Sequence, residues 1–102
     1  MANTFLNYTA SDVGTSGTTV YTVPASTTAV VIGLNAANVE TSQIAVDAEL
    51  ASTFLVKGAP IPANSALSLL DGKIILEAGD TVVVTSDTAA SADVILSVLE
   101  QT

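Results

Sequence analysis

The chain has 102 residues and a formal net charge of −8, because its ten acidic residues are accompanied by only two cations, Lys57 and Lys73. That length supports one hydrophobic core, so we expect a single domain spanning residues 1–102. Two cations are too few to neutralise phosphate groups, which excludes nucleic acids and anionic membranes as partners. Histidine, cysteine and arginine are absent, which closes the common routes to nucleophilic catalysis, metal binding and disulfide formation.

The composition describes a folded protein with few surface charges. Apolar residues make up 49% of the chain, which excludes a disordered class, and charged residues make up 12%, about half the usual share. Thr, Ser, Asn and Ala must cover the surface instead, which indicates packing against other subunits. The first residues show no basic segment followed by an apolar stretch, and no apolar run reaches the length of a membrane span. We therefore expect a soluble protein made without an export signal.

Short apolar runs with a two-residue period predict strands throughout the chain, separated by turn residues at regular intervals. Residues 1–12 are expected to form an N-terminal arm or an edge strand, with loose alternation from residue 3. The second strand stops at Pro24, because proline cannot donate a hydrogen bond to a ladder. The expected strands are residues 3–12, 18–23, 28–38, 42–50, 52–57, 65–70, 73–77, 81–85 and 92–99.

Within four of these strands, the alternation predicts which side chains share an apolar face. Residues 42–50 alternate most cleanly, and a helix over the same residues would place acidic side chains on its apolar side. The side chains expected to share a face are Val30, Ile32 and Leu34; Ile44, Val46, Ala48 and Leu50; Phe54 and Val56; and Val94, Leu96 and Val98.

The turn residues predict how the strands connect. Residues 58–64 contain prolines and predict an extended crossing between sheets or edges. Asp71-Gly72 predicts a hairpin between the strands on either side, and Glu77-Ala78-Gly79-Asp80 predicts a second tight turn. With no helix predicted, the fold class is all-β: an antiparallel β-sandwich, jelly-roll-like, of about eight or nine strands.

Acidic residues gather near the predicted turns, with Asp71, Glu77 and Asp80 close in sequence and Asp87 and Asp93 flanking the next loop. Tight turns favour aspartate beside glycine for backbone reasons. A calcium site needs roughly six to eight converging oxygens, and none of these segments resembles such a loop. No pair of carboxylates lies in the apolar setting that glycoside hydrolysis requires. We therefore interpret these residues as turn residues, with calcium as the alternative, and predict no metal and no cofactor.

A serine nucleophile requires a general base, and Lys57 and Lys73 are the only candidates in a chain without histidine. Both are expected in solvent, Lys57 at the end of a strand and Lys73 after a turn. We predict that the protein is not an enzyme and has no catalytic residue.

The aromatic residues are the remaining candidates for recognition. Phe54 lies on an apolar strand face and is assigned to the core. Phe5 and Tyr8 lie in the less regular N-terminal region and are the predicted partner contacts, provided that this region docks on a neighbour. A local edge strand is the alternative for the same residues.

Three runs of the chain form a recognisable set. Residues 21–31 read YTVPASTTAVV, residues 62–65 read PANS, and residues 69–80 read LLDGKIILEAGD. Together they resemble a group of small structural proteins of tailed bacteriophages, in which a Y-T-V-P-A strand end precedes a sandwich and an L-x-A-G-D turn leads to the last strands. The resemblance covers roughly residues 18–100. It implies a virion protein, first a head decoration (cement) protein and second a tail or neck component.

The resemblance also implies partners and a location. The expected partners are the major capsid protein and further copies of the chain, as trimers or dimers at capsid symmetry axes. The expected location is the capsid surface of the virion, after synthesis in the host cytoplasm. No catalytic or ligand residue comes with the resemblance. A glycan-binding, host-attachment module is the alternative from another class.

Overall fold

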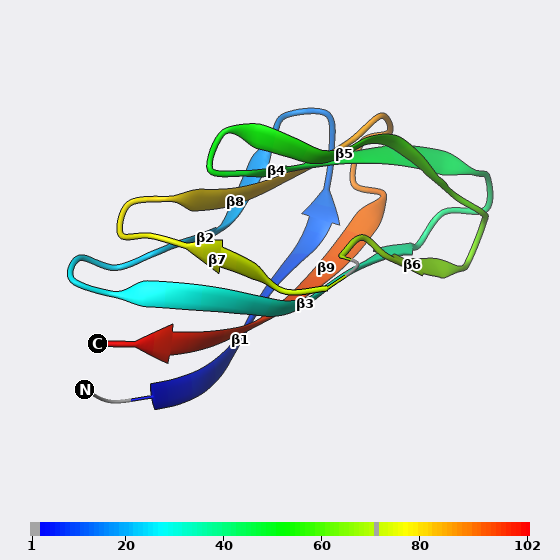
Figure 1. Cartoon of the computed structure of the whole chain (residues 1–102). Helices are drawn as coiled ribbons and strands as arrows, with labels where there is room; N and C mark the ends of the chain where they lie inside the picture. The colour runs from blue at the N-terminus through cyan, green and yellow to red at the C-terminus, as the bar shows by residue number, and fades with distance from the viewer. Residues whose placement is uncertain (1–2, 71) are drawn as a thin grey trace.

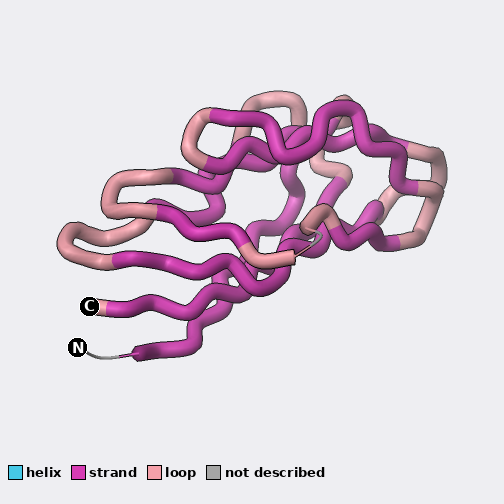
Figure 2. The backbone as a smooth tube through the Cα atoms, in the orientation of Figure 1, coloured by secondary structure: helices cyan, strands magenta, loops and turns pink. Residues whose placement is uncertain are grey.

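A computed structural model describes residues 3–70 and 72–102, and Figure 1 shows two layers of strands facing each other. The described residues form strands and loops, with no helix among them (Figure 2). The strands are β1 (Asn3–Val13), β2 (Thr18–Thr22), β3 (Thr28–Asn38), β4 (Ile44–Leu50), β5 (Thr53–Ile61), β6 (Ala66–Ser68), β7 (Ile74–Leu76), β8 (Thr81–Ser86) and β9 (Ala92–Gln101).

The strands form two antiparallel sheets whose order defines the topology. Sheet A has the order β1-β9-β3-β6, with β7 also paired to β3, and sheet B has the order β2-β8-β4-β5. The first half of the chain therefore pairs with the second half in reverse order: β1 with β9, β2 with β8, β3 with β6 and β7, and β4 with β5. This arrangement is a jelly roll, and the predicted fold class is confirmed.

The predicted hairpin at Asp71-Gly72 is wrong. Asp71 itself lies outside the described residues, but the strands on either side, β6 and β7, both pair antiparallel with β3. β6 lies opposite residues 35–37 and β7 opposite residues 29–31, so the two follow one another in a single strand position. A hairpin would fold β7 back along β6. Here the longer apolar strand β3 offers both segments a partner instead.

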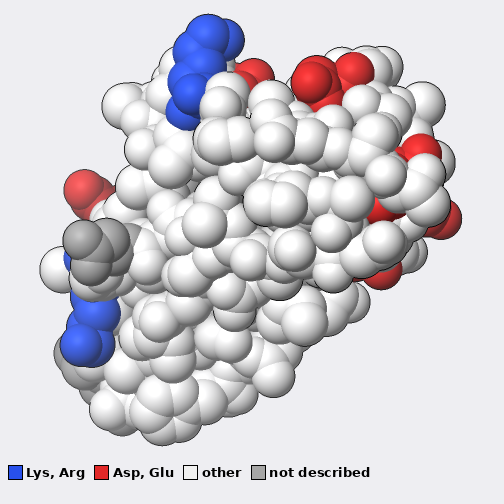
Figure 3. Space-filling view, turned by 90° about the vertical axis from the view of Figure 1, so that its right-hand side faces the viewer, with Lys and Arg blue, Asp and Glu red and all other residues white. Residues whose placement is uncertain are grey.

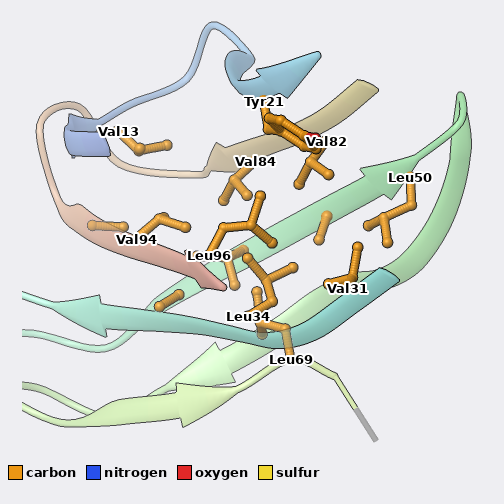
Figure 4. Packing of buried hydrophobic residues seen from close by; sticks show 14 of the residues in the cluster. Val13, Tyr21, Val31, Leu34, Leu50, Leu69, Val82, Val84, Val94 and Leu96 are labelled. Carbon is orange, nitrogen blue, oxygen red and sulfur yellow. The ribbon is translucent and has the colours of Figure 1, made fainter. Parts of the chain in front are cut away.

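The core lies between the sheets and follows the predicted alternation in β4 and β9. The expected residues of both strands are buried, with Val46, Leu96 and Val98 at 0% exposure. Figure 4 shows Leu96 and Leu34 from sheet A pointing towards Val84 of sheet B. Burying side chains of this size stabilises a fold by about 1.5–3 kcal/mol each.

In β3 the predicted face is wrong because the strand contains a β-bulge. The register with β9 shifts between Val31 and Gly33, so one extra residue interrupts the alternation. Before the bulge Val31 is buried, whereas Ile32 is 41% exposed; beyond the bulge Leu34 is buried. Val30 and Ile32 therefore lie outside, and Leu34 lies inside.

The prediction that Phe54 belongs to the core is also wrong. Phe54 pairs with Glu49 on the outer side of sheet B and is 48% exposed. The register of β4 and β5 shifts between Ala48 and Glu49, and this changes which residues of β5 face inward. Val56, opposite Ala48, packs half-buried against the core as expected.

Most of the predicted crossing at residues 58–64 is in fact strand. β5 continues to Ile61, and Pro60 is tolerated because β5 lies at the edge of sheet B, where one side of the ladder needs no donor. Gly58 has a φ of 67° and lies at a second register shift. The change from sheet B to sheet A therefore takes place after Ile61.

The side chain of Asn38 links the end of β5 to the loop after β3 through hydrogen bonds. The side chain is 3% exposed. Its Nδ2 donates to the carbonyls of Ser42 at 2.8 Å and Ile61 at 3.0 Å, and its Oδ1 accepts from the Glu40 N–H at 2.8 Å. The buried amide thus forms hydrogen bonds with backbone groups that a neighbouring strand would otherwise pair with.

The bulge in β3 can be tested with two isosteric substitutions. Val31→Thr places a hydroxyl in the core and is expected to lower the free energy of unfolding by about 1–3 kcal/mol. The matched change Val30→Thr lies on the outer face and is expected to cost within about 0.5 kcal/mol. Urea unfolding followed by circular dichroism measures both. Equal costs would contradict the face assignment.

Candidate interaction surface

The two predicted contact residues lie on opposite faces of β1. Phe5 points away from the core and is 73% exposed. Tyr8 is half-buried, faces the interior and packs against the core. β1 pairs along its length with β9 of the same chain and so takes the form of a local edge strand. Phe5 and Tyr8 therefore do not form one patch.

Tyr8 belongs to a cluster between the two sheets. Its ring centroid lies 4.5 Å from that of Tyr21 on β2. Oε2 of Glu100 on β9 accepts hydrogen bonds from both hydroxyls, at 2.5 Å from Tyr21 and 3.3 Å from Tyr8. Because β1 and β2 are the neighbouring edges of the two sheets, the cluster closes the sandwich on that side.

The environment of this cluster keeps both phenols protonated. Burial raises the pKa of Tyr21 above its ordinary value, and the hydrogen bond to Glu100 and the charge of Glu100 raise it further. Burial also raises the pKa of Tyr8, followed by the charge and hydrogen bond of Glu100. A phenol with a raised pKa stays protonated near neutral pH, and the protonated form is a poor base and a poor nucleophile. The cluster therefore suits cohesion between the sheets better than proton transfer.

The outer face of sheet A carries an apolar row across its strands. Phe5 pairs with Leu99, Leu99 with Val30, and Val30 with Ile75. Residues directly opposite in a ladder share a face, so these four side chains are neighbours from β1 to β7. Phe5 is 73% and Ile75 is 68% exposed, and Leu99 and Val30 are half-buried between them. We call these four residues the apolar row.

On β1 and β9, the apolar row is followed on the same face by residues of mixed polarity. Asn7 pairs with Ser97, whose hydroxyl donates to Asn7 Oδ1 at 2.7 Å. Thr9 pairs with Ile95, which is 52% exposed. Asp93 lies farther along the same face, and the exposed residues Lys73 and Glu77 lie two positions before and after Ile75 in the chain.

The outer face of sheet B has a different character. Asp47 and Glu49 face outward on β4, opposite Thr85 and Val83 of β8. Lys57 Nζ lies 4.0 Å from Asp47 Oδ2 and 4.6 Å from the centroid of the Phe54 ring. Figure 3 shows lysine atoms in blue at two separate places, with uncharged atoms covering most of that side of the molecule. Three ionic side chains, Asp47, Glu49 and Lys57, thus lie on the strands of sheet B.

The carboxylates near turns act as backbone acceptors, as predicted for Asp80. Asp80 Oδ2 accepts from the Glu77 N–H at 2.9 Å, and the Asp80 N–H donates to the Glu77 carbonyl at 3.0 Å. Asp87 Oδ1 accepts from the Ala45 N–H at 3.1 Å, and Asp93 Oδ1 accepts from the N–H of Asp12 at 3.1 Å. Asp71 lies outside the described residues.

Within residues 3–70 and 72–102, no three side chains gather as metal ligands, and no pocket is present in this part of the chain. Nor do these residues include a helix long and apolar enough to cross a membrane. No model of a known protein family matches the chain, and no curated protein matches its sequence. The candidate site is the apolar row on the outer face of sheet A.

Three members of the apolar row were not predicted from the sequence as contact residues. Val30 was grouped with residues on the far side of the bulge, and Ile75 lies within the run Ile74-Ile75-Leu76, which has no alternation to mark a face. Leu99 lies on an outward face where polar residues such as Asp93 and Ser97 interrupt the apolar ones, so no apolar alternation marks it. The signal that pointed to this surface was the aromatic residue Phe5 in the less regular N-terminal region.

The tyrosine cluster predicts how stability depends on alkaline pH. In the unfolded chain tyrosine has a pKa of about 10, and folding raises the pKa of Tyr21. The contribution to stability is therefore complete below about pH 10 and declines as the pH rises further, because the unfolded state releases its proton first. Between pH 8 and 11, the wild type is expected to lose about 1 kcal/mol more than Tyr21→Phe.

Urea unfolding at the two pH values measures this difference. At pH 8 Tyr21→Phe is expected to be about 1 kcal/mol less stable than the wild type, because it lacks the hydrogen bond to Glu100. An equal loss of stability in the two proteins would refute the role of the cluster.

Proposed function

We propose that the protein is a structural protein of a tailed bacteriophage virion, namely a head decoration protein that binds the outer capsid surface and stabilises the head through protein–protein contacts. The observation that carries this proposal is the apolar row on the outer face of sheet A. Two further features support it: the jelly-roll topology, which recurs in viral capsid proteins, and the sequence resemblance over residues 18–100.

The apolar row is suited to binding a protein surface. Its four side chains lie on four hydrogen-bonded strand segments of one sheet, so little conformational entropy is lost when they are covered. Each square ångström of apolar surface removed from water contributes about 25 cal/mol. Aromatic and aliphatic side chains near the centre of an interface commonly carry most of its affinity. Phe5 and Ile75 are the members best placed to enter pockets on a partner.

The charge distribution supports the same mode of binding. With a net charge of −8, free copies repel one another in general, and electrostatic repulsion is expected to be weakest where two copies approach through the apolar row.

A virion surface protein also benefits from resistance to proteases. Trypsin cleaves after lysine and arginine, and this chain offers it only Lys57 and Lys73.

The proposal includes the major capsid protein as partner, self-association as a dimer or trimer, and a location on the capsid surface. A tail or neck component and a glycan-binding attachment module are the competing functions. They differ in a measurable quantity: a decoration protein is present in many copies over the head, and a tail or neck component in few copies at one vertex.

The first test is the location and copy number of the chain in purified particles, from electron microscopy and quantitative gel staining. Many copies spread over the head surface are expected. A few copies confined to the tail or neck, or saturable binding to a glycan array without binding to heads, would replace the proposal with the corresponding alternative.

The second test concerns the apolar row. Ile75→Asp is expected to weaken binding to heads from which the protein has been removed by at least about tenfold, because it places a charge among desolvated side chains. Val39→Asp is the matched control, since Val39 is an exposed apolar residue (46%) outside the row. Co-sedimentation with the heads measures both variants. Equal binding by the two would remove the row from the interface.

A further inference from the structure

The four edges of the two sheets differ in how well they are protected from pairing with another strand. β2 has 5 residues and a register shift, and β6 and β7 have 3 residues each. β5 carries Lys57, Gly58 and Pro60 and contains two register shifts. Short strands, proline, lysine and bulges are the features that natural proteins use to block edge pairing.

β1 lacks these features over most of its length. It has 11 residues, and its register with β9 is unbroken from Asn3 to Ala10. This stretch contains no proline, glycine or charged residue. On the side away from β9, no strand among the described residues pairs with β1. A long, regular, uncharged edge of this kind is a template for an added strand.

The inner side of β1 is also incompletely covered. Leu6, Tyr8 and Ala10 face the interior but are only half-buried, whereas the corresponding side chains of β9 are fully buried. The reason is that β2, the neighbouring edge strand of sheet B, is less than half as long as β1. A strand added beside β1 would cover Phe5 on the outer side and Leu6 and Tyr8 on the inner side. Such a strand would also satisfy the free backbone groups.

We infer that a second copy of the chain pairs antiparallel with β1, edge to edge, across a two-fold axis at Asn7. The inference rests on the self-association included in the proposed function and specifies its interface. An antiparallel pair of identical strands is self-complementary, so the contact closes as a dimer. Sheet A would become one continuous sheet, with both outer faces on the same side.

The axis follows from the register. In such a pair, residues that lie opposite one another must point to the same face, so the axis passes through a residue and not between two. Centring on Asn7 places Phe5 opposite Thr9 and Leu6 opposite Tyr8 of the other copy, and the paired stretch is then residues 3–11. Moving the axis towards the N-terminus shortens this stretch.

The stretch ends naturally at Asp12. This residue has a φ of 57°, its N–H donates to Asp93 Oδ1, and the register of β1 shifts between Ala10 and Val13. Ending there also keeps the carboxylate of Asp12 outside the paired region. At the axis, Asn7 Oδ1 accepts from Ser97, which leaves its Nδ2 to donate towards the other copy.

A single cysteine tests the axis, because the chain contains no cysteine of its own. Residues directly opposite in an antiparallel pair have Cα atoms about 4.5–5.5 Å apart, within the range of a disulfide. Asn7→Cys is therefore expected to form a covalent dimer on mild oxidation. Thr19→Cys, an exposed position on the edge strand β2, is the matched control and is expected to form no covalent dimer, because its cysteines lie away from the axis. Equal cross-linking of the two variants, or none in Asn7→Cys, would overturn the inference.

Solution mass provides the second measurement. The wild type is expected to show twice the monomer mass of 10.2 kDa by light scattering, with the monomer appearing on dilution. Asn7→Lys places two like charges at the axis and is expected to be monomeric with an unchanged circular dichroism spectrum. A monomeric wild type, or a dimeric Asn7→Lys, would overturn the inference.

Binding to phage heads separates this inference from the proposed function. If the wild type binds heads as a monomer, the edge interface is wrong and the decoration role stands. If it forms the Asn7-centred dimer but does not bind heads, the interface stands and the decoration role is wrong.

Discussion

Backbone pairing along β9 is the interaction on which the rest of the structure depends. β9 lies between β1 and β3 and joins the two ends of the chain to its middle, with Gln101 opposite both Asn3 and Thr28. A strand inside a sheet must pair on both sides, because unpaired backbone groups there cost free energy. The same strand supplies Leu96 to the core, Glu100 to the tyrosine cluster and Leu99 to the apolar row. β9 therefore contributes both to the cohesion between the two sheets and to the outer face of sheet A.

The bulge in β3 connects core packing with the candidate interaction surface. With strict alternation, Val30 and Leu34 would lie on the same face of β3. If that face were the inner one, Val30 would not belong to the apolar row; if it were the outer one, Leu34 would not belong to the core. One extra residue between Val31 and Gly33 allows both placements, because it reverses the face of every residue beyond it. The outer row is thus built from residues that a regular strand could not present.

The outer faces of the two sheets differ in character. Asp47, Glu49 and Lys57 lie on the outer side of sheet B, and the apolar row lies on the outer side of sheet A. In a jelly roll the two sheets face away from each other, so their outer faces can vary independently of the shared core. The proposed decoration role draws on the sheet A face, and the proposed dimer draws on its edge at β1.

Most strands and turns could be predicted from the sequence, because they depend on local backbone geometry and on a two-residue period. The faces of β4 and β9 and the turn at Glu77–Asp80 follow from residues close in sequence. Only the tertiary structure decided that β6 and β7 share one strand position, that Phe54 lies outside, and that Phe5 and Ile75 belong to one row. The physical reason is that burial and register depend on the neighbouring strand, which for Phe5 and Ile75 comes from distant parts of the chain.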